Sequence, residues 1–468
     1  MVAAVMSLAA TSWSRSRRIS SPVAEESVVN LWKRRAVRRI LLGLLLLVPL
    51  LAIGRMGQVY LESQPHGARG PYLQMPAPDG ITIRWQTLEK VQGVVHFGTA
   101  PERLDQSRQG AVDTLHELRL SGLLPDTRYF YRVDANVHEF RTAPLPGAER
   151  PVRLWVQGDP GRANALTLQG RDAALKWASE HPREGLPPID LWLTTGDNAY
   201  SSGKDENFQK QLFSVYPQLL PSVPYLPVHG NHDARRNAFF GLFTFPAQGE
   251  SGGLPSGSEH YFAVDYGQVH LIILDSEEGD MDKGSPMLRW LQRDLAATRQ
   301  PWIIALLHHP PYSRGSHNSD SRTDSGGRMR KVRSNIVPLL EQGGVDLALF
   351  GHSHVYERTH LMACHYGDAK SFSPSMQQPS PEGEYRKPLM RQPLGGTLYS
   401  VVGSTAYADS GPLDHPAMAV ARAQRGSLLL DVEGDTLNGY FITPHGEVTD
   451  RYRITRAGAV KPLFKGCD

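Results

Sequence analysis

Five apolar runs of strand length in this chain each end in side chains that bind metal ions, and this pattern is the strongest constraint on the fold. The run over 345–350 is followed at once by Gly351 and then by His352 and His354. Alternate residues of an extended segment share a face, so both imidazoles can point the same way where the strand ends. The other four runs end, in chain order, at Asp159, at Asp197 with Tyr200, at Asn231 and at His308. Such side chains at successive strand ends predict a metal centre along one edge of a sheet.

These residues stand in short motifs, which are GDPG with Asp159, GDNAY with Asp197 and Tyr200, GNHD with Asn231, HHPPY with His308, and GHSH with His352 and His354. In this order the motifs resemble those of the metallophosphoesterases, and specifically the purple acid phosphatases. Tyr200 narrows the resemblance, because the purple acid phosphatases add a tyrosine three residues after the second aspartate. Each motif alone is weak, but all seven ligand positions filled in order, each after a predicted strand, are a strong signal.

The resemblance implies two metal ions and a division of the ligands between them. One metal would be bound by Asp159, Tyr200 and His354, the other by Asn231, His308 and His352, and Asp197 would bridge them. A phenolate and carboxylates suit a hard trivalent ion, so Fe(III) is expected in the first site, and a divalent Fe, Zn or Mn in the second. The expected activity is that of an acid phosphatase, in which a metal-held hydroxide attacks the phosphorus of a small phosphate monoester.

Two further histidines are candidates for protonating the leaving group and contacting the phosphate. His232 directly follows the ligand Asn231. His317 lies where plant-like members of the family place a substrate-contacting histidine, nine residues after the ligand of HHPPY. The loop over 313–330 otherwise departs from the family, and Asn318 replaces a second histidine there. A solvated loop residue therefore remains the alternative for His317.

The chain is expected to contain a basic N-terminal segment with its linker, two domains and a short tail, over 1–67, 68–146, 150–456 and 457–468. Short alternating strands separated by turns, over 81–85, 93–97, 116–120, 129–133 and 139–142, predict a small β-sandwich. The segment GLLPDTRYFYRV, with Tyr129 or Tyr131 at a corner, resembles a fibronectin type III domain.

Beyond a proline-rich boundary at 142–150, strands alternate with amphipathic helices at 165–179 and 287–297. This alternation predicts mostly parallel sheets with helices on their faces. The expected class is thus α+β/α/β, a β-sandwich followed by the four-layer αββα domain that the resemblance implies. The Ser- and Pro-rich stretch 371–395 is interpreted as a long surface excursion.

The N-terminal segment predicts export. An apolar run over 40–54 follows a cluster of basic residues, and 56–67 is interpreted as a linker. Fifteen apolar residues are short for a bilayer span, which needs about 20, but suit a signal peptide. A cleaved leader and an uncleaved membrane anchor are both open, and each places the protein in the periplasm or outside the cell. A buried core helix is disfavoured by the adjacent arginines.

Charge and cysteine content restrict the possible partners. Residues 1–55 hold nine Lys or Arg against two Glu, so the remainder has 41 basic and 45 acidic residues. A nucleic-acid-binding domain would show the opposite balance. Cys364 and Cys467 form neither a disulfide framework nor a zinc motif, and whether they pair is open.

Two alternatives to a phosphomonoesterase remain. The first is a phosphodiesterase or nucleotide pyrophosphatase on the same metal centre, since ligands determine the chemistry and surrounding loops determine the substrate. The second is a catalytically silent surface protein whose β-rich module recruits a partner. The natural substrate, the divalent metal and the oligomeric state are not specified by the sequence.

Overall fold

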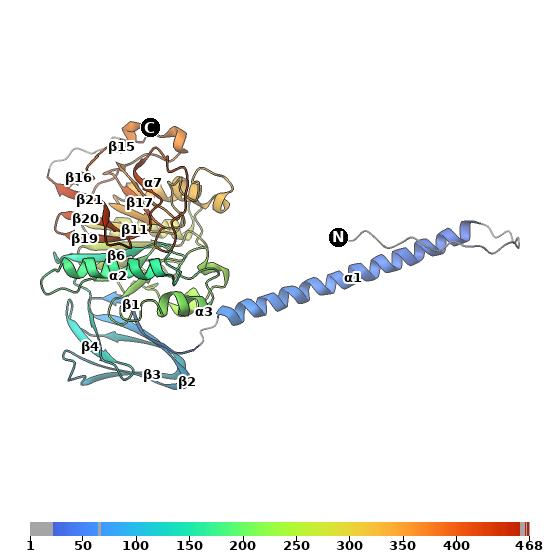
Figure 1. Cartoon of the computed structure of the whole chain (residues 1–468), viewed down its shortest axis with the longest axis horizontal. Helices are drawn as coiled ribbons and strands as arrows, with labels where there is room; N and C mark the ends of the chain where they lie inside the picture. Colours follow the sequence, from blue (N-terminus) through green and yellow to red (C-terminus); the bar gives the residue numbers. More distant parts are fainter. Residues whose placement is uncertain (1–21, 64–66, 459–463, 465, 468) are drawn as a thin grey trace. The chain divides into compact units, whose positions relative to one another are not determined.

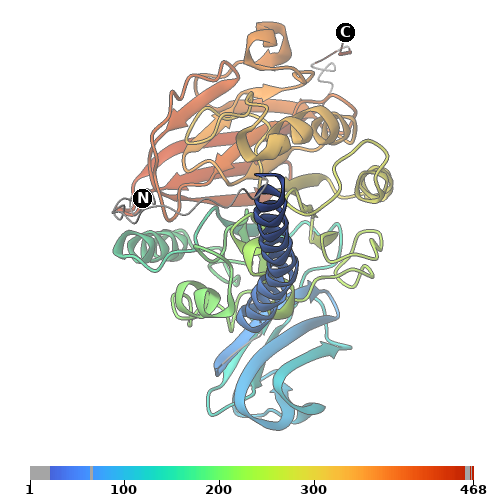
Figure 2. The same ribbon diagram turned by 90° about the vertical axis from the view of Figure 1, so that its right-hand side faces the viewer.

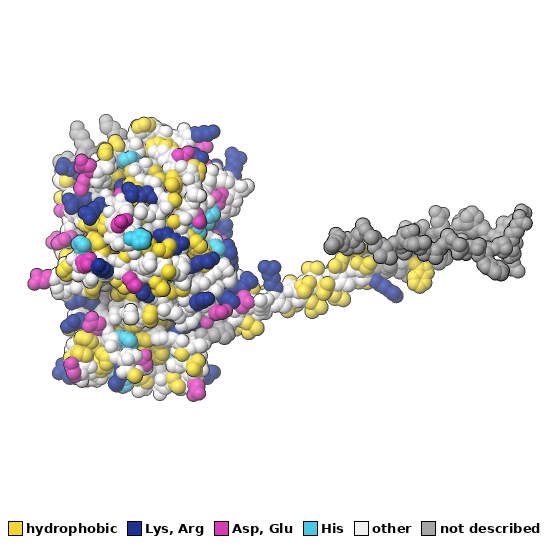
Figure 3. Space-filling model, viewed as in Figure 1, with side chains coloured by type: hydrophobic (Ala, Val, Ile, Leu, Met, Phe, Trp, Pro, Cys, Tyr) yellow, Lys and Arg dark blue, Asp and Glu magenta, His cyan; other side chains and the backbone are white. Residues whose placement is uncertain are grey.

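The computed structural model describes residues 22–63, 67–458, 464, 466 and 467. The chain forms two compact units, Met1–Val59 and Tyr60–Asp468. Helix α1 (Pro22–Ser63) contains a 26-residue stretch, Val37–Glu62, of mean hydropathy 2.2. By length and composition that stretch can cross a bilayer, which needs about 20 residues, although a signal sequence passes the same test. Large apolar side chains are exposed along it, as Figure 3 shows.

Residues 56–63 of the linker expected over 56–67 are helical and continue α1 to Ser63. Gly54 and Gly57 lie within this helix, and no proline follows them before Ser63. A single glycine weakens a helix by only about 1 kcal/mol, which neighbouring helix formers overcome.

The β-rich domain contains five strands in one sheet, drawn in blue to cyan in Figure 1: β1 (Arg69–Ala77), β2 (Gly80–Gly98), β3 (Gln106–Ser121), β4 (Arg128–Arg132) and β5 (His138–Arg141). Two expected strands, 81–85 and 93–97, are halves of the long β2. Its first half pairs with β1 and its last residues with β4, while β3 pairs with both halves. Register shifts after Gln86 and Gln92 bend β2, so one curved sheet encloses the core in place of two separate sheets.

Tyr129 rather than Tyr131 makes the corner. The Tyr129 hydroxyl accepts a hydrogen bond from the backbone of Leu124 at 3.0 Å. Tyr131 instead donates to the carbonyl oxygen of Pro221 at 2.8 Å, and Tyr72 donates to that of Leu242 at 2.6 Å. These two buried tyrosines therefore join the β-rich domain to the larger domain.

The larger domain contains two seven-stranded sheets. The first has the order β16 (Glu384–Pro388), β21 (Val448–Ala457), β20 (Thr436–Ile442), β19 (Ser427–Glu433), β6 (Val152–Gln157), β7 (Leu191–Thr194) and β8 (Tyr225–Pro227). The second has the order β18 (Met418–Arg422), β13 (Tyr356–Thr359), β17 (Leu398–Val402), β12 (Leu347–Phe350), β11 (Trp302–Leu306), β10 (Val269–Leu274) and β9 (Tyr261–Tyr266). In the first sheet the neighbours β6, β7 and β8 pair in parallel, and in the second sheet β10, β11, β12 and β17 do so. The pairs outside these strands are mostly antiparallel. The expectation of mostly parallel sheets thus holds only for the strands that reach the site.

Helices cover the outer faces of both sheets (Figures 1 and 2). Helix α2 (Ala165–Glu180) packs Trp177 on the first sheet, and α5 (Pro286–Ala297) and α7 (Val337–Gln342) pack Leu291 and Leu340 on the second. Alternate residues of the central strands point inward, so that Leu271, Ile304 and Leu349 share one core with Leu154 and Leu193. The predicted four-layer αββα arrangement is confirmed.

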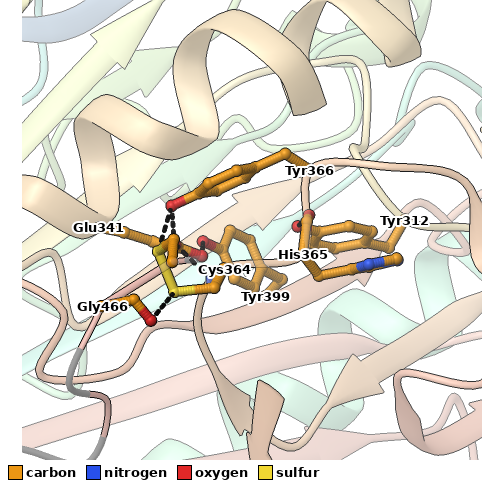
Figure 4. The surroundings of a disulfide bond; sticks show 8 residues. Tyr312, Glu341, Cys364, His365, Tyr366, Tyr399 and Gly466 are labelled. Atoms are coloured by element: carbon orange, nitrogen blue, oxygen red, sulfur yellow. Dashed lines mark hydrogen bonds between the residues drawn. A yellow bond between two sulfur atoms is a disulfide. The ribbon is translucent and has the colours of Figure 1, made fainter. Parts of the chain in front are cut away.

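Cys364 and Cys467 form a disulfide, which settles the question that the sequence left open (Figure 4). Beside it lies Glu341, which accepts hydrogen bonds from the backbone of Cys364 at 2.9 Å and from the hydroxyls of Tyr366 and Tyr399 at 2.7 and 2.8 Å. Burial raises the pKa of Glu341 to about 7. The disulfide thus attaches Cys467, close to the C-terminus, to the region where Glu341 of α7 contacts Tyr366 and Tyr399.

Candidate metal centre

The parallel strands of both sheets deliver the sequence-predicted ligands to one place. Asp159, Asp197 and Asn231 follow β6, β7 and β8, and His308 and His352 follow β11 and β12. Asp159, Asp197 and His352 have positive φ angles of 54°, 54° and 66°. Non-glycine residues rarely adopt this conformation, and such strain concentrates at functional sites.

One group of side chains contains Asp159, Tyr200 and His354. The Tyr200 hydroxyl lies 3.1 Å from Asp159 Oδ1 and 3.0 Å from His354 Nε2. His354 Nε2 lies 3.6 Å from Asp159 Oδ1. Burial, followed by the charges of Asp159 and Asp197, holds the pKa of Tyr200 well above its ordinary value. Without a cation the phenol therefore stays protonated.

A second group contains Asn231, His308 and His352. Asn231 Oδ1 lies 3.0 Å from both His308 Nε2 and His352 Nδ1, and these two nitrogens are 3.3 Å apart. Asp197 links the two groups: its Oδ1 lies 3.5 Å from His308 Nε2, and its charge also acts on Tyr200.

The donor atoms fit two cations. Asp159 and Asp197 are buried carboxylates at 0% and 2% exposure, and neither has a Lys or Arg partner within the described residues. Buried anions need a compensating charge, and clustered oxygen and nitrogen lone pairs need a cation or protons between them. The first group combines carboxylate and phenol oxygens with the imidazole of His354, whereas the second group contains an amide oxygen and two imidazoles.

Hydrogen bonds from outside the cluster orient the imidazoles. His308 Nδ1 lies 2.8 Å from the carbonyl oxygen of Thr195, and His354 Nδ1 lies 2.6 Å from Asp409 Oδ2. In each ring this contact leaves Nε2 directed at the cluster, as in protein metal sites generally. His352 Nε2 lies 2.5 Å from the hydroxyl of Ser325.

Asp233 connects two of the ligand loops. Fully buried, it accepts hydrogen bonds from the backbone of Asn198 at 2.9 Å and of Gly230 at 3.0 Å. Burial and the charge of Asp197 raise the pKa of Asp233 to about 7. Asp233, Asp409 and Ser325 were not predicted from the sequence. Only Asp233 had a visible signal, because it stands within the motif GNHD.

Both predicted catalytic histidines lie beside the cluster. His232 Nδ1 lies 2.8 Å from the carbonyl oxygen of Ser201, and its Nε2 lies 3.9 Å from Asp197 Oδ2. The His317 ring stacks on His352 with centroids 4.0 Å apart, and His317 Nδ1 lies 2.8 Å from Asp324 Oδ1. The structure thus brings all nine sequence-predicted site residues together, and their roles remain predictions.

Two family models match this chain. The calcineurin-like phosphoesterase model matches residues 152–356, and the model of the purple acid phosphatase N-terminal domain matches residues 69–144. Both matches lie within the compact unit that contains the site.

Curated relatives and a solved structure agree with these models. Probable purple acid phosphatase 20 of Arabidopsis thaliana is 25% identical over 64% of this chain and 70% of its own length. A nucleotide pyrophosphatase/phosphodiesterase of Hordeum vulgare is 28% identical over 48% of this chain and 64% of its own length. The structure of purple acid phosphatase PPD1 from Lupinus luteus seeds matches with a TM-score of 0.66 at 19% identity, covering 82% of this chain and 74% of that one. That likeness shows a shared fold.

Proposed function

Because this chain belongs to the purple acid phosphatase-like metallophosphoesterases, we propose that it hydrolyses phosphate monoesters at two metal ions held by the clustered side chains. The observation that carries the proposal is the convergence of Asp159, Asp197, Tyr200, Asn231, His308, His352 and His354 at the ends of parallel strands. When bound, a metal pair polarises the phosphoryl oxygens and lowers the pKa of water.

The donor sets favour two different ions. Asp159 and the phenolate of Tyr200 suit Fe(III), whereas Asn231, His308 and His352 suit a divalent Fe, Zn or Mn. Asp197 lies between the two groups of donors, where its carboxylate could bind both ions. Loss of the Tyr200 proton then depends on a nearby cation, because the pKa of this phenol is otherwise well above its ordinary value.

His232 and His317, which lie beside the cluster, would contact the substrate. His232 Nδ1 is engaged by the Ser201 carbonyl, so a proton given to the departing alkoxide would come from Nε2. His317 Nδ1 is engaged by Asp324, so its Nε2 would contact a phosphoryl oxygen. In this structure His232 Nε2 accepts a hydrogen bond from Arg235 Nη2 at 3.3 Å, and burial together with the charge of Arg235 lowers the pKa of His232.

The protein is proposed to act outside the cytoplasm. The apolar stretch of α1 lies near the N-terminus and suits a signal peptide or an anchor. The disulfide between Cys364 and Cys467 is typical of an oxidising compartment.

Hydrolysis of phosphodiesters or nucleotide pyrophosphates on the same centre is the second candidate. The specific observation in its favour is the barley relative of that name, 28% identical over 48% of this chain.

The test combines metal analysis, a visible spectrum and two assays on one purified sample. We expect about two metals per chain including iron, a visible phenolate-to-Fe(III) band, and faster hydrolysis of para-nitrophenyl phosphate than of its bis ester. The Asp197→Ala variant serves as the inactive control. A colourless protein with two divalent ions would refute the proposed Fe(III) site. A preference for the bis ester would refute the proposed phosphomonoesterase activity.

A further inference from the structure

A hollow of about 390 Å³ lies beside Tyr200. It is lined by Tyr200, whose hydroxyl belongs to the candidate metal centre, by Ala163, and by the polar residues Arg162, Asn164, Ser201, Asn207, Lys210 and Gln211. No carboxylate is among the residues that line it. Such a lining of cationic and amide groups suits an anion.

The position of Arg162 is set by stacked rings. Its guanidinium carbon lies 4.8 Å from the centroid of the Tyr407 ring. Tyr407 in turn stacks on His354, with centroids 4.8 Å apart and an interplanar angle of 12°, and meets Tyr200 edge-on at 5.1 Å. A cation over an aromatic face is held by the ring quadrupole. One aromatic ring therefore separates the guanidinium of Arg162 from a predicted metal ligand.

The two cations of the hollow are available to a ligand. Lys210 is exposed in the turn of helix over Gln209–Phe213, and Arg162 is exposed just before α2. Within the described part of the chain neither side chain forms a salt bridge, whereas the neighbouring Lys204 pairs with Glu206 at 2.9 Å. Phosphate is well matched to such a pair, because the guanidinium fork binds two of its oxygens and the ammonium adds a point charge.

We infer that this hollow, the Arg162–Lys210 pocket, binds a second phosphate group of the substrate. The inference rests on the proposed function and narrows its substrate class to monoesters that carry two or more phosphates. While one phosphate lies at the metal centre, the other lies beyond Tyr200 and is neutralised by Arg162 and Lys210. The amide of Asn207 completes the polar lining.

A matched pair of substrates tests the pocket, namely glucose 6-phosphate and glucose 1,6-bisphosphate. We expect wild-type kcat/KM to be at least about tenfold higher for the bisphosphate, since two charge-assisted contacts are added. Arg162→Ala combined with Lys210→Ala should abolish this preference by raising KM for the bisphosphate, while kcat stays nearly unchanged. This is the result expected when an interaction contributes equally to binding of the substrate and of the transition state. The rate on glucose 6-phosphate should also stay nearly unchanged.

Two further variants serve as controls. Lys210→Arg keeps the charge and should keep the preference. Lys283→Ala removes an exposed lysine in the loop before α5 and should leave kcat/KM unchanged for both substrates. Equal loss of activity on both substrates in the double variant, or an unchanged preference, would overturn the inference.

Failure of the proposed function gives a different result, in which wild type hydrolyses neither sugar phosphate. The pocket is then judged by calorimetric titration of the metal-loaded protein with glucose 1,6-bisphosphate. Binding at least about tenfold weaker in the double variant supports the pocket, and equal binding overturns it.

Discussion

The Nδ1 atom of His354 lies 2.6 Å from Asp409 Oδ2, and this contact leaves Nε2 facing Asp159 and Tyr200. The two residues are 55 positions apart, and the Asp409 side chain is half exposed. A carboxylate that engages the remote nitrogen of a ligand imidazole fixes the ring and raises its basicity. Asp409 is therefore a positioning residue for the first group of donors.

Asp409→Ala is expected to weaken metal binding by about 10- to 100-fold, the usual loss when such a partner is removed. Chelator competition followed by metal analysis measures this directly. Asp414→Ala is the matched control, because Asp414 is also exposed and pairs only with Arg314 among the described residues, at 3.3 Å. Asp409→Asn keeps a hydrogen-bond acceptor, so its metal affinity should lie between those of wild type and the alanine variant. Equal affinities in all of these proteins would contradict the role of Asp409.

Tyr200→Phe is expected to remove the visible absorption band while preserving the fold. The ring packs against His232 and Tyr407, and phenylalanine keeps those contacts. The hydroxyl contacts Asp159 and His354, so its loss affects the first group of donors and spares Asn231, His308 and His352. Absorption spectra and thermal unfolding of the two proteins provide the measurement. A band that persists in the variant would place another ligand on iron.

His270 provides a pH-dependent test of stability away from the site. On β10 its Nδ1 and Nε2 atoms each lie 2.7 Å from a carboxylate, those of Asp265 and Asp294. Burial alone would lower the pKa of His270, but the hydrogen bonds to and charges of both aspartates raise it to about 9. That value exceeds the pKa of about 6.5 of an unfolded histidine. The stabilisation is therefore complete below about pH 6.5 and is lost as pH rises through the folded pKa.

His270→Gln is accordingly expected to lower the free energy of unfolding by about 3 kcal/mol at acidic pH, because it leaves buried charges unpaired. The difference from wild type should shrink towards about pH 10. Urea unfolding across this pH range measures both effects, and His445→Gln, at an exposed histidine, is the control. A difference that grows with pH would contradict the sign of the shift.

The candidate metal ligands could be found from the sequence because each signal is local. Asp159 and Asn231 each follow a glycine one or two residues after a short strand-like run, and parallel strands bring such positions together whatever the intervening loops. Asp409 and Ser325 gave no such signal. Asp409 lies in an irregular loop and Ser325 in the short helical turn over Asp324–Gly327, and only tertiary structure brings them to His354 and His352.

The fold was predicted less well where long-range pairing overrides local pattern. Polar residues between Gln86 and Val91 indicated a turn, yet β2 continues through them because β3 pairs with both halves. The stretch 371–395 was expected to be a surface excursion, but it contributes β16, whose Tyr385 and Lys387 are buried beside β21. Lys387 is charged, and its burial depends on Asp346 at 2.7 Å, a partner that sequence pattern does not reveal.

Charges placed in the apolar stretch of α1 should block export. Leu46 and Leu47 lie within Val37–Glu62, and each arginine near the centre of a spanning helix costs about 2.5–3.5 kcal/mol. We expect Leu46→Arg combined with Leu47→Arg to retain the protein in the cytoplasm. Leu46→Ile combined with Leu47→Ile is the matched control and should be exported as wild type. Cell fractionation with an activity assay measures the outcome, and export of the arginine variant would show that α1 is not the targeting element.

Cys467→Ser is expected to lower the free energy of unfolding by about 2–4 kcal/mol while leaving kcat/KM for para-nitrophenyl phosphate nearly unchanged. The bond closes a loop with a sequence separation of 103, so its loss frees a long segment of the unfolded chain. In the folded protein the site keeps its strand-end ligands, none of which contacts the bond. Urea unfolding of wild type with and without reductant should reproduce the effect of the substitution. Reductant should have no effect on the variant, and a further loss there would show that stability depends on some other group.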